Sequence, residues 1–349
     1  MLANIYKIKK KLIILPQIVT YSFKTFEKKQ IHTVPKKGPW SVLFFGTDDF
    51  SVESLKTLHK EYESKALCRL EVVTTQNKKR NEVASYATQN GITINTWPLT
   101  SDITDFHIGI VVSFGHLISA HIINSFPLGM LNVHGSLLPR WRGASPITYS
   151  IMNGDTHTGV TIMTVLPKKF DIGDIIAQEQ TNISPDETFP ELRARLAKIG
   201  ASLLGETLNK LPSVLSNGRP QNQMEVTYAP KLTPNISLII WDEMSATHIY
   251  NLQRALTGLY PLTTKFQDIT IKLLDVRKIQ KSSHLSHIKP DIPGVVTFDK
   301  VNNVLIVKCK DDSWVSVAKV SMPGRRLMSA KDFNNGFISG QKEKVTIFR

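Results

Sequence analysis

Asn132 and His134 lie two residues apart in the segment LNVHGSLLPRWRGASPI, which spans residues 131–147. On a strand this spacing places both side chains on the same face. An amide beside an imidazole suits a reaction in which negative charge develops on a carbonyl oxygen, because the amide donates to the oxyanion while the imidazole moves a proton. A polar pair at a strand end is also common in turns, so both interpretations stay open for the pair alone.

Two nearby features favour the catalytic interpretation. The sequence SLLPRWRG follows the pair directly and predicts a loop that Pro139 stiffens and Gly143 closes before a helix. The backbone groups of this loop and the helix N-terminus are suited to an anionic or polar ligand. The sequence FDIGDII begins after a later strand, and we expect its Asp171 to approach His134, to hold one imidazole tautomer and to stabilise the imidazolium.

Short apolar runs and amphipathic segments alternate along the first part of the chain. Apolar runs predict strands at residues 41–46, 70–75, 107–115, 129–135 and 158–165. Helical spacing of apolar residues predicts helices at 48–62, 81–91, 119–126, 144–154 and 188–212. This alternation predicts a doubly wound, mostly parallel sheet, as in a Rossmann-like α/β fold. Such sheets bind ligands beyond the carboxyl ends of their strands, where Asn132 and His134 are expected.

The pattern changes after residue 236. One helix is predicted at 245–258, and short strands are predicted at 262–267, 269–279, 294–299, 303–310 and 313–322. Short strands at regular spacing are typical of a small, OB-like β-barrel. We therefore expect a catalytic domain at 39–212, a linker rich in Pro, Asn, Ser and Gly at 213–235, and a barrel domain at 236–349.

The first 38 residues differ in composition from the rest. The chain has 349 residues and a net charge of +14, and residues 1–40 hold nine lysines against a single acid, Glu27. This basic segment is typical of a mitochondrial presequence, with a disordered lysine-rich tail as the alternative. Its apolar run LIILPQIV is too short, and interrupted by Pro16, to span a bilayer. The remaining chain is mildly basic, which permits a nucleic-acid partner without requiring one.

Composition and spacing argue against two other kinds of site. The chain's two cysteines, Cys68 and Cys309, form no CxxC pair, so neither a thiolate zinc site nor a disulfide framework is expected. Both are predicted to be core residues. Gly46 lies at the first predicted strand-to-helix turn without the GxGxxG spacing, which disfavours NAD binding.

Several motifs carry a family resemblance. The run LNVHGSLLPRWRGASPITYSIMNGDTHTGVTIM, followed by FDIGD, resembles the folate-dependent formyltransferases, and TYAPKL (227–232) and PGRRLMSAKDF (323–333) extend the likeness. The resemblance implies a catalytic set of Asn132, His134 and Asp171. It implies 10-formyltetrahydrofolate as the formyl donor, lying along Ser136, Leu137, Leu138 and Pro139 and near Gly115, with no metal.

The branch of the family that this sequence resembles acts on the α-amine of methionine carried by initiator tRNA. The resemblance implies a monomer in the mitochondrial matrix that serves translation initiation and has no membrane partner. Contacts to tRNA are expected from six basic residues, namely Lys78, Lys79, Arg80, Lys231, Arg325 and Arg326. A solvated turn is the alternative for the first three, and surface charge for solubility is the alternative for the others.

Three alternatives stay open at this point. A 10-formyltetrahydrofolate hydrolase or a sugar-nucleotide formyltransferase would use the same Asn, His and Asp set, and a catalytically silent RNA-binding protein is a further class. Intact Asn132, His134 and Asp171 argue against the silent protein. Arg140 and Arg142 are predicted to face the folate glutamate, the tRNA end or an internal carboxylate.

Overall fold

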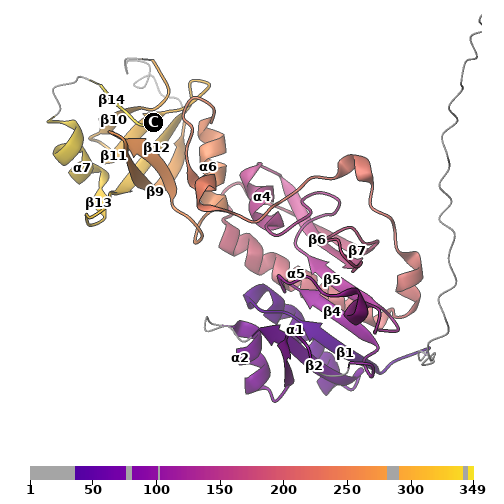
Figure 1. Cartoon of the computed structure of the whole chain (residues 1–349). Helices are drawn as coiled ribbons and strands as arrows, with labels where there is room; N and C mark the ends of the chain where they lie inside the picture. Colours follow the sequence, from indigo (N-terminus) through magenta and orange to yellow (C-terminus); the bar gives the residue numbers. More distant parts are fainter. Residues whose placement is uncertain (1–35, 76–80, 101–102, 281–290, 341–344) are drawn as a thin grey trace, which may run out of the picture. The chain divides into compact units, whose positions relative to one another are not determined.

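A computed structural model of the chain describes residues 36–75, 81–100, 103–280, 291–340 and 345–349 (Figure 1). All but the last three residues of the predicted presequence, 1–38, lie outside the described residues, and so do Lys78, Lys79 and Arg80. None of the helices within the described ranges is both long and apolar enough to cross a membrane.

The first sheet has seven strands in the order β3-β2-β1-β4-β5-β6-β7. Strands β1 to β5 pair in parallel, whereas β6 runs antiparallel to both β5 and β7. The predicted doubly wound, mostly parallel sheet is therefore confirmed. Its strands are β1 (Trp40–Phe45), β2 (Leu67–Thr75), β3 (Thr93–Trp97), β4 (Ile108–Val112), β5 (Met130–His134), β6 (His157–Thr164) and β7 (Ile175–Asn182).

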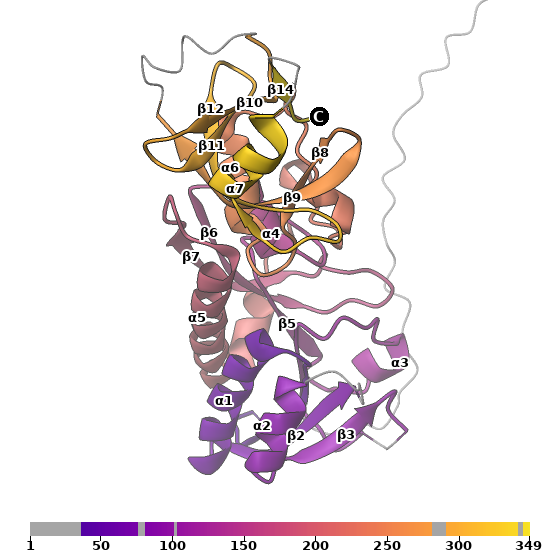
Figure 2. The ribbon, with the colours of Figure 1, turned by 90° about the vertical axis from the view of Figure 1, so that its left-hand side faces the viewer.

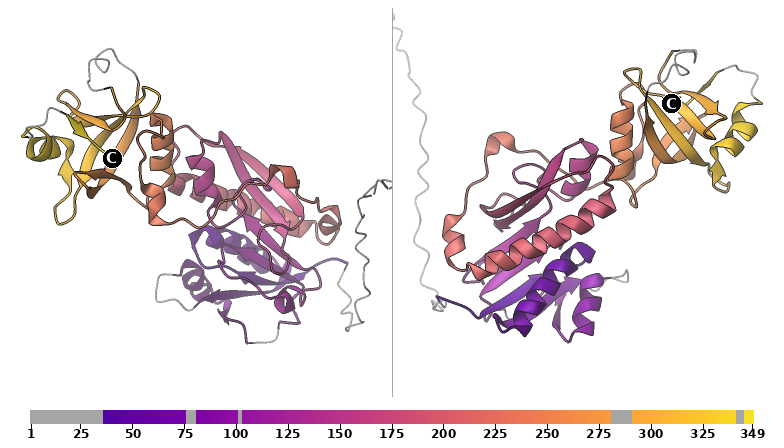
Figure 3. Two further views of the ribbon diagram at one scale, coloured as in Figure 1. Left: turned by 45° about the horizontal axis from the view of Figure 1, so that its top comes forward. Right: turned by 180° about the vertical axis from the view of Figure 1, so that it is seen from behind.

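Both faces of this sheet are buried, which explains the continuous apolar runs of its central strands. Along β1, Val42 and Phe44 join one core cluster, while Leu43 and Phe45 join another on the opposite face. Helices α1 and α5 pack side by side in the first cluster (Figure 3). The helices of this domain are α1 (Asp49–Glu63), α2 (Glu82–Gln89), α3 (Ala120–Ile123), α4 (Pro146–Met152) and α5 (Phe189–Asn209).

The two edge strands, β3 and β7, are absent from the sequence prediction. Strand β3 reads TINTW and β7 reads IIAQEQTN, and much of each is exposed. An edge strand buries less of its side-chain surface than a central strand, so it needs no apolar run. Cys68 on β2 also differs from its prediction, because it alternates with the buried Leu67 and is exposed.

The second sheet is antiparallel and curls on itself (Figure 2). Its main order is β14-β10-β11-β12-β9-β8. Two backbone hydrogen bonds between Lys265 on β8 and Arg349, just after β14, connect the two ends of this order. The predicted small β-barrel is confirmed. Its elements are α6 (Ala246–Ala255), β8 (Leu262–Phe266), β9 (Ile269–Ile279), β10 (Val295–Asp299), β11 (Val304–Lys308), β12 (Trp314–Ser321), β13 (Met328–Ser329), α7 (Ala330–Phe333) and β14 (Thr346–Ile347).

Candidate active site

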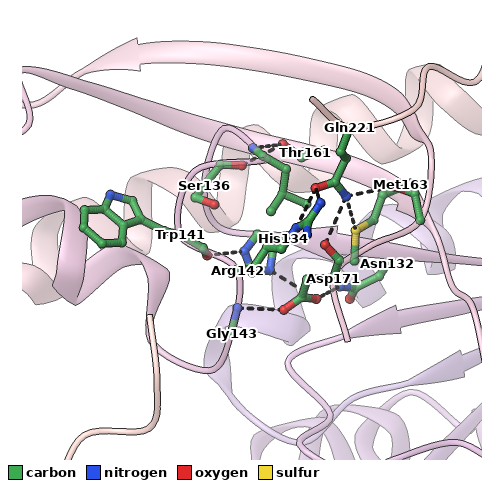
Figure 4. A network of polar contacts seen from close by, with 12 residues as sticks. Asn132, His134, Ser136, Trp141, Arg142, Gly143, Thr161, Met163, Asp171 and Gln221 are labelled. Atoms are coloured by element: carbon green, nitrogen blue, oxygen red, sulfur yellow. Dashed lines mark hydrogen bonds and ion pairs between the residues drawn. The ribbon is translucent and has the colours of Figure 1, made fainter. Parts of the chain in front are cut away.

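Strand β5 presents the predicted amide and imidazole to the same side of the sheet. Leu131 and Val133 point into the core that α5 covers, so Asn132 and His134 project from the opposite face. Asp171, which follows β6, lies beside them (Figure 4). The structure thus brings together the three residues proposed from the sequence as the catalytic set.

Hydrogen bonding fixes the orientation of the His134 ring. Its Nε2 lies 3.0 Å from the backbone carbonyl oxygen of Trp141, and since a carbonyl only accepts, Nε2 carries the proton. In the neutral ring Nδ1 therefore has a free lone pair, and it faces Asp171 with 3.7 Å between Nδ1 and Oδ1. The Trp141 carbonyl, in the loop after β5, thus contributes to the choice of tautomer, and the expectation that Asp171 holds it stays a prediction.

Asp171 is held by backbone as well as by side-chain groups. Its Oδ2 accepts a hydrogen bond from the Gly143 N–H at 2.8 Å, and its Oδ1 lies 3.5 Å from the Asn132 amide nitrogen. The residue has a φ of 54°, in the left-handed region that Asp tolerates better than most residues. Its carboxylate is 11% exposed, which leaves its charge little screened by water.

Two glycines permit the close backbone approaches that this arrangement needs. Gly143 has a φ of 123°, and a Cβ there would lie 2.6 Å from the carbonyl oxygen of Ala229. A Cβ on Gly173 would lie 1.7 Å from the carbonyl oxygen of Thr164. Neither distance is compatible with a side chain, so glycine is required where the loops around Asp171 cross other segments.

Asn132, His134 and Asp171 line a cleft of about 660 Å³. Gly115, one of the predicted donor contacts, lines the same cleft. Much of the remaining wall is apolar, and it comes from two segments that follow strand ends, SFGHLI after β4 and VLPKKF after β6. No local sequence pattern marks these residues as part of a wall, and they include Phe114, Leu117, Ile118, Val165, Leu166 and Phe170.

The segment Ser136–Pro139 does not line this cleft. The Ser136 hydroxyl donates to the Arg140 carbonyl oxygen at 2.7 Å, and Leu138 packs against Met163 and Ile175. Leu137, Leu138 and Pro139 line a second cavity of about 960 Å³. The structure shows the contacts that these residues make within the protein. Their contacts with a folate donor stay a prediction.

The two arginines of the loop stabilise the loop itself. Arg140 donates to both carboxylate oxygens of Asp155, at 2.9 and 2.6 Å, and its guanidinium lies over the Trp141 ring. The hydrogen bond to Asp155 raises the pKa of Arg140. Arg142 is 5% exposed, and its Nε and Nη2 donate to the Gln221 amide oxygen at 2.9 and 2.7 Å.

Residues 219–229, which we call the strap, run along this loop although the sequence predicts a linker there. The Arg142 N–H donates to the Thr227 carbonyl at 2.9 Å, and the Ala229 N–H donates back to the Arg142 carbonyl at 2.7 Å. At the other end of the strap, Arg219 and Ile175 exchange two backbone hydrogen bonds. The strap is thus tied to both the loop after β5 and the strand after Asp171.

The predicted tRNA-binding residues in the described part of the chain lie outside the cleft. Lys231, Arg325 and Arg326 are exposed, and the Arg325 guanidinium lies 5.2 Å from the centre of the Phe337 ring. Within the described ranges, no group of three or more His, Cys, Asp or Glu side chains is arranged to hold a metal ion.

Comparison with known proteins identifies the family. Residues 99–208 match the "Formyl transferase" family model, and residues 231–338 match the model "Formyl transferase, C-terminal domain". The human mitochondrial methionyl-tRNA formyltransferase is 42% identical over 314 residues, which cover 87% of this chain and 79% of the human protein. This chain belongs to the methionyl-tRNA formyltransferase family.

Solved structures share the fold at low sequence identity. WlaRD, a sugar 3N-formyl transferase crystallised in the presence of dTDP and 5-N-formyl-THF, has a TM-score of 0.58 and 18% identity, covering 83% of this chain and all of that chain. HypX from Aquifex aeolicus in complex with tetrahydrofolic acid has a TM-score of 0.55 and 13% identity, covering 89% and 51% of the two chains. Both structures were thus determined with a folate present.

Proposed function

We propose that this chain transfers the formyl group of 10-formyltetrahydrofolate to the α-amine of methionyl-tRNA, in the mitochondrial matrix and as a monomer. The observation that carries the proposal is the single cleft in which Asn132, His134 and Asp171 meet beside an apolar wall. Its volume lies within the roughly 300–1,000 Å³ of small-molecule sites, and an apolar wall suits the flat rings of a folate.

In the first step the amine nitrogen bonds to the formyl carbon, and the electron pair of the C=O bond moves to oxygen. A free α-amine has a pKa of about 7.7–8.0. The electron-withdrawing ester beside the α-amine of an aminoacyl-tRNA lowers that pKa, so much of the amine is neutral and nucleophilic near neutral pH. The Asn132 amide donates to the oxyanion. The Nδ1 lone pair of His134 accepts the proton that the attacking nitrogen loses, and the nearby Asp171 carboxylate stabilises the resulting imidazolium.

In the second step the bond between the formyl carbon and the folate nitrogen breaks. The oxyanion electrons reform the C=O bond, and His134 returns its proton to the leaving nitrogen. The products are the formylated amine and tetrahydrofolate, and the histidine ends neutral as it began. Since Nε2 stays bonded to the Trp141 carbonyl, Nδ1 alone takes part in both transfers.

Similarity over most of the chain favours methionyl-tRNA as the acceptor. The human relative matches 87% of the chain, and the C-terminal formyltransferase model matches residues 231–338. The sugar formyltransferase shares 18% identity and supports the fold alone. The mammalian relatives are mitochondrial forms, which supports a mitochondrial location.

An assay with two readouts tests this function. The purified protein is incubated with 10-formyltetrahydrofolate and methionyl-tRNA, and formylmethionyl-tRNA and free formate are both measured. We expect formylmethionyl-tRNA, with uncharged tRNA giving no product. Release of formate without a tRNA product would instead support the hydrolase alternative.

A further inference from the structure

The side chain of Gln221 lies at the centre of the polar network, yet it is not one of the reactive groups (Figure 4). It is 6% exposed and belongs to the strap. Its amide oxygen accepts two hydrogen bonds from Arg142, and its amide nitrogen donates to the carbonyl oxygens of Asp171 and Gly173 at 3.0 and 2.8 Å. This buried side chain therefore connects two loops, with its amide oxygen bound to one and its amide nitrogen bound to the other.

The acceptor side of Gln221 faces the loop that orients the histidine. Arg142 stands between Trp141, whose carbonyl accepts from His134, and Gly143, whose N–H donates to Asp171. Holding the Arg142 guanidinium therefore fixes the two backbone groups on either side of it. The contact between Gln221 and Arg142 therefore links the strap to the backbone groups that bind His134 and Asp171.

The donor side of Gln221 faces the loop that carries the carboxylate. Asp171 has a left-handed φ, a conformation that persists where surrounding contacts determine it. The Gln221 amide nitrogen binds the carbonyl of this residue and that of Gly173, on either side of the turn. A displacement of this turn would move the carboxylate away from Nδ1 of His134.

We propose that Gln221 is a positioning residue for formyl transfer: it holds the Asp171 loop and the Arg142 loop in register, so that the carboxylate faces Nδ1 of His134. The inference rests on the proposed function. Gln221 lies between the segments matched by the two family models, 99–208 and 231–338. A displacement of about 1 Å at reacting groups can cost about 100-fold in rate, so a positioning contact has a measurable effect.

Two substitutions separate the donor and acceptor sides of the amide. Gln221→Glu keeps an acceptor for Arg142 but places oxygen against the carbonyls of Asp171 and Gly173. Gln221→Met removes both sides without adding a charge. We expect both to lower kcat by about 10- to 100-fold, with the KM values for donor and tRNA nearly unchanged, because Gln221 does not line the cleft.

Gln223 provides the matched control. It lies two residues along the strap and is exposed. Its amide oxygen lies 3.5 Å from Arg142 Nη1 and its amide nitrogen donates to the backbone carbonyl of Gln221 at 3.0 Å, but neither group contacts the Asp171 loop. Gln223→Glu and Gln223→Met should leave kcat within about twofold of wild type, as surface substitutions usually do. Thermal unfolding of each full-length variant sets an assay temperature at which it is folded.

A double-mutant cycle with Asp171→Asn tests positioning against a general loss of structure. If Gln221 acts through the Asp171 carboxylate, Gln221→Glu should cost much less in single-turnover rate when that carboxylate is already gone. Equal costs in both backgrounds, or normal kcat in both Gln221 variants, would overturn the inference. Failure of the wild-type protein to formylate methionyl-tRNA would instead overturn the proposed function.

Discussion

The surroundings of the cleft and the core of the barrel are built from different chemistry. At and around the cleft of the first domain, His134, Arg142 and Gln221 are all buried, and each makes a hydrogen bond of 3.0 Å or shorter. The core cluster of the barrel consists of aliphatic and aromatic side chains with Cys309. Burial raises the pKa of the Cys309 thiol to about 12, as expected for a group in an apolar interior.

This difference predicts whether a substitution in each region first lowers activity or first lowers stability. A buried polar network depends on distance and direction, and leaving one member unpaired costs about 1–3 kcal/mol. An apolar core depends on filled volume, and removing buried side-chain volume lowers the free energy of unfolding. Substitutions in the polar network around the cleft should therefore damage the reaction before the fold, and substitutions in the barrel core should damage the fold first.

The largest effect is expected at His134. Replacing His134 with Ala removes the proton carrier, so kcat should fall by about 10²- to 10⁴-fold in a formylation assay. Thermal unfolding should change little by comparison, because one hydrogen bond to the Trp141 carbonyl is lost. His157→Ala, at an exposed histidine, serves as the control and should retain activity. Normal turnover by His134→Ala would remove this residue from the mechanism.

In the barrel the expectation reverses. Leu273 on β9 is fully buried, so Leu273→Ala should lower the free energy of unfolding by about 2–5 kcal/mol in denaturant titrations. Turnover of the folded fraction should stay close to wild type. Ile269→Ala, on the same strand at a side chain that is 44% exposed, should cost far less. An equal cost at both positions would contradict the packing argument.

The exterior of the barrel offers a smaller test. If Arg325 and Arg326 contact tRNA, reversing both charges to Glu should raise the KM for methionyl-tRNA by roughly tenfold and weaken its salt dependence. The kcat at saturating tRNA should be unchanged, since neither residue lines the cleft. The matched variant Lys272→Glu with Lys300→Glu changes the net charge equally. The same rise in KM in both variants would point to net charge alone.

The smallest effect is expected at the exposed start of α5. Hydrogen bonds from the hydroxyl and the backbone N–H of Thr188 lower the pKa of Glu191. Because the pKa of Glu191 is lower in the folded state than its ordinary value of 4.5, its ionised carboxylate stabilises the fold at pH values above 4.5. This stabilisation is lost as the pH falls through the folded-state pKa. Melting curves of Glu191→Gln should therefore converge with wild type in acid. Glu206→Gln, further along α5, removes a carboxylate without removing the Thr188 contacts and therefore controls for the loss of charge.

The sequence predicts the central elements well because their signals are local. The apolar runs of β1, β4 and β5 and the period-two spacing of Asn132 and His134 are visible without any tertiary information. Edge strands β3 and β7 carry no such signal, because their partners cover only part of them. Exposure of Cys68 was also missed, since residue type alone did not show which face of β2 it occupies.

The candidate site could be predicted only in part. The meeting of Asn132, His134 and Asp171 follows from strand ends, but their orientation depends on contacts distant in sequence. No local pattern shows that the Trp141 carbonyl contributes to the choice of histidine tautomer, or that Gln221 reaches Arg142 across 79 positions of chain. Turn-rich composition predicts a linker at 213–235, and composition does not reveal backbone pairing with a distant loop.

The position of the strap in the sequence also determines when the candidate active site can be completed during synthesis. Asn132, His134 and Asp171 all precede the end of α5 at Asn209. The backbone that closes over Gly143 arrives only with Ala229. A nascent chain that stops after α5 therefore holds every reactive group but lacks the segment that keeps them in register. During synthesis on the ribosome, the reaction centre is assembled from early residues and finished by late ones.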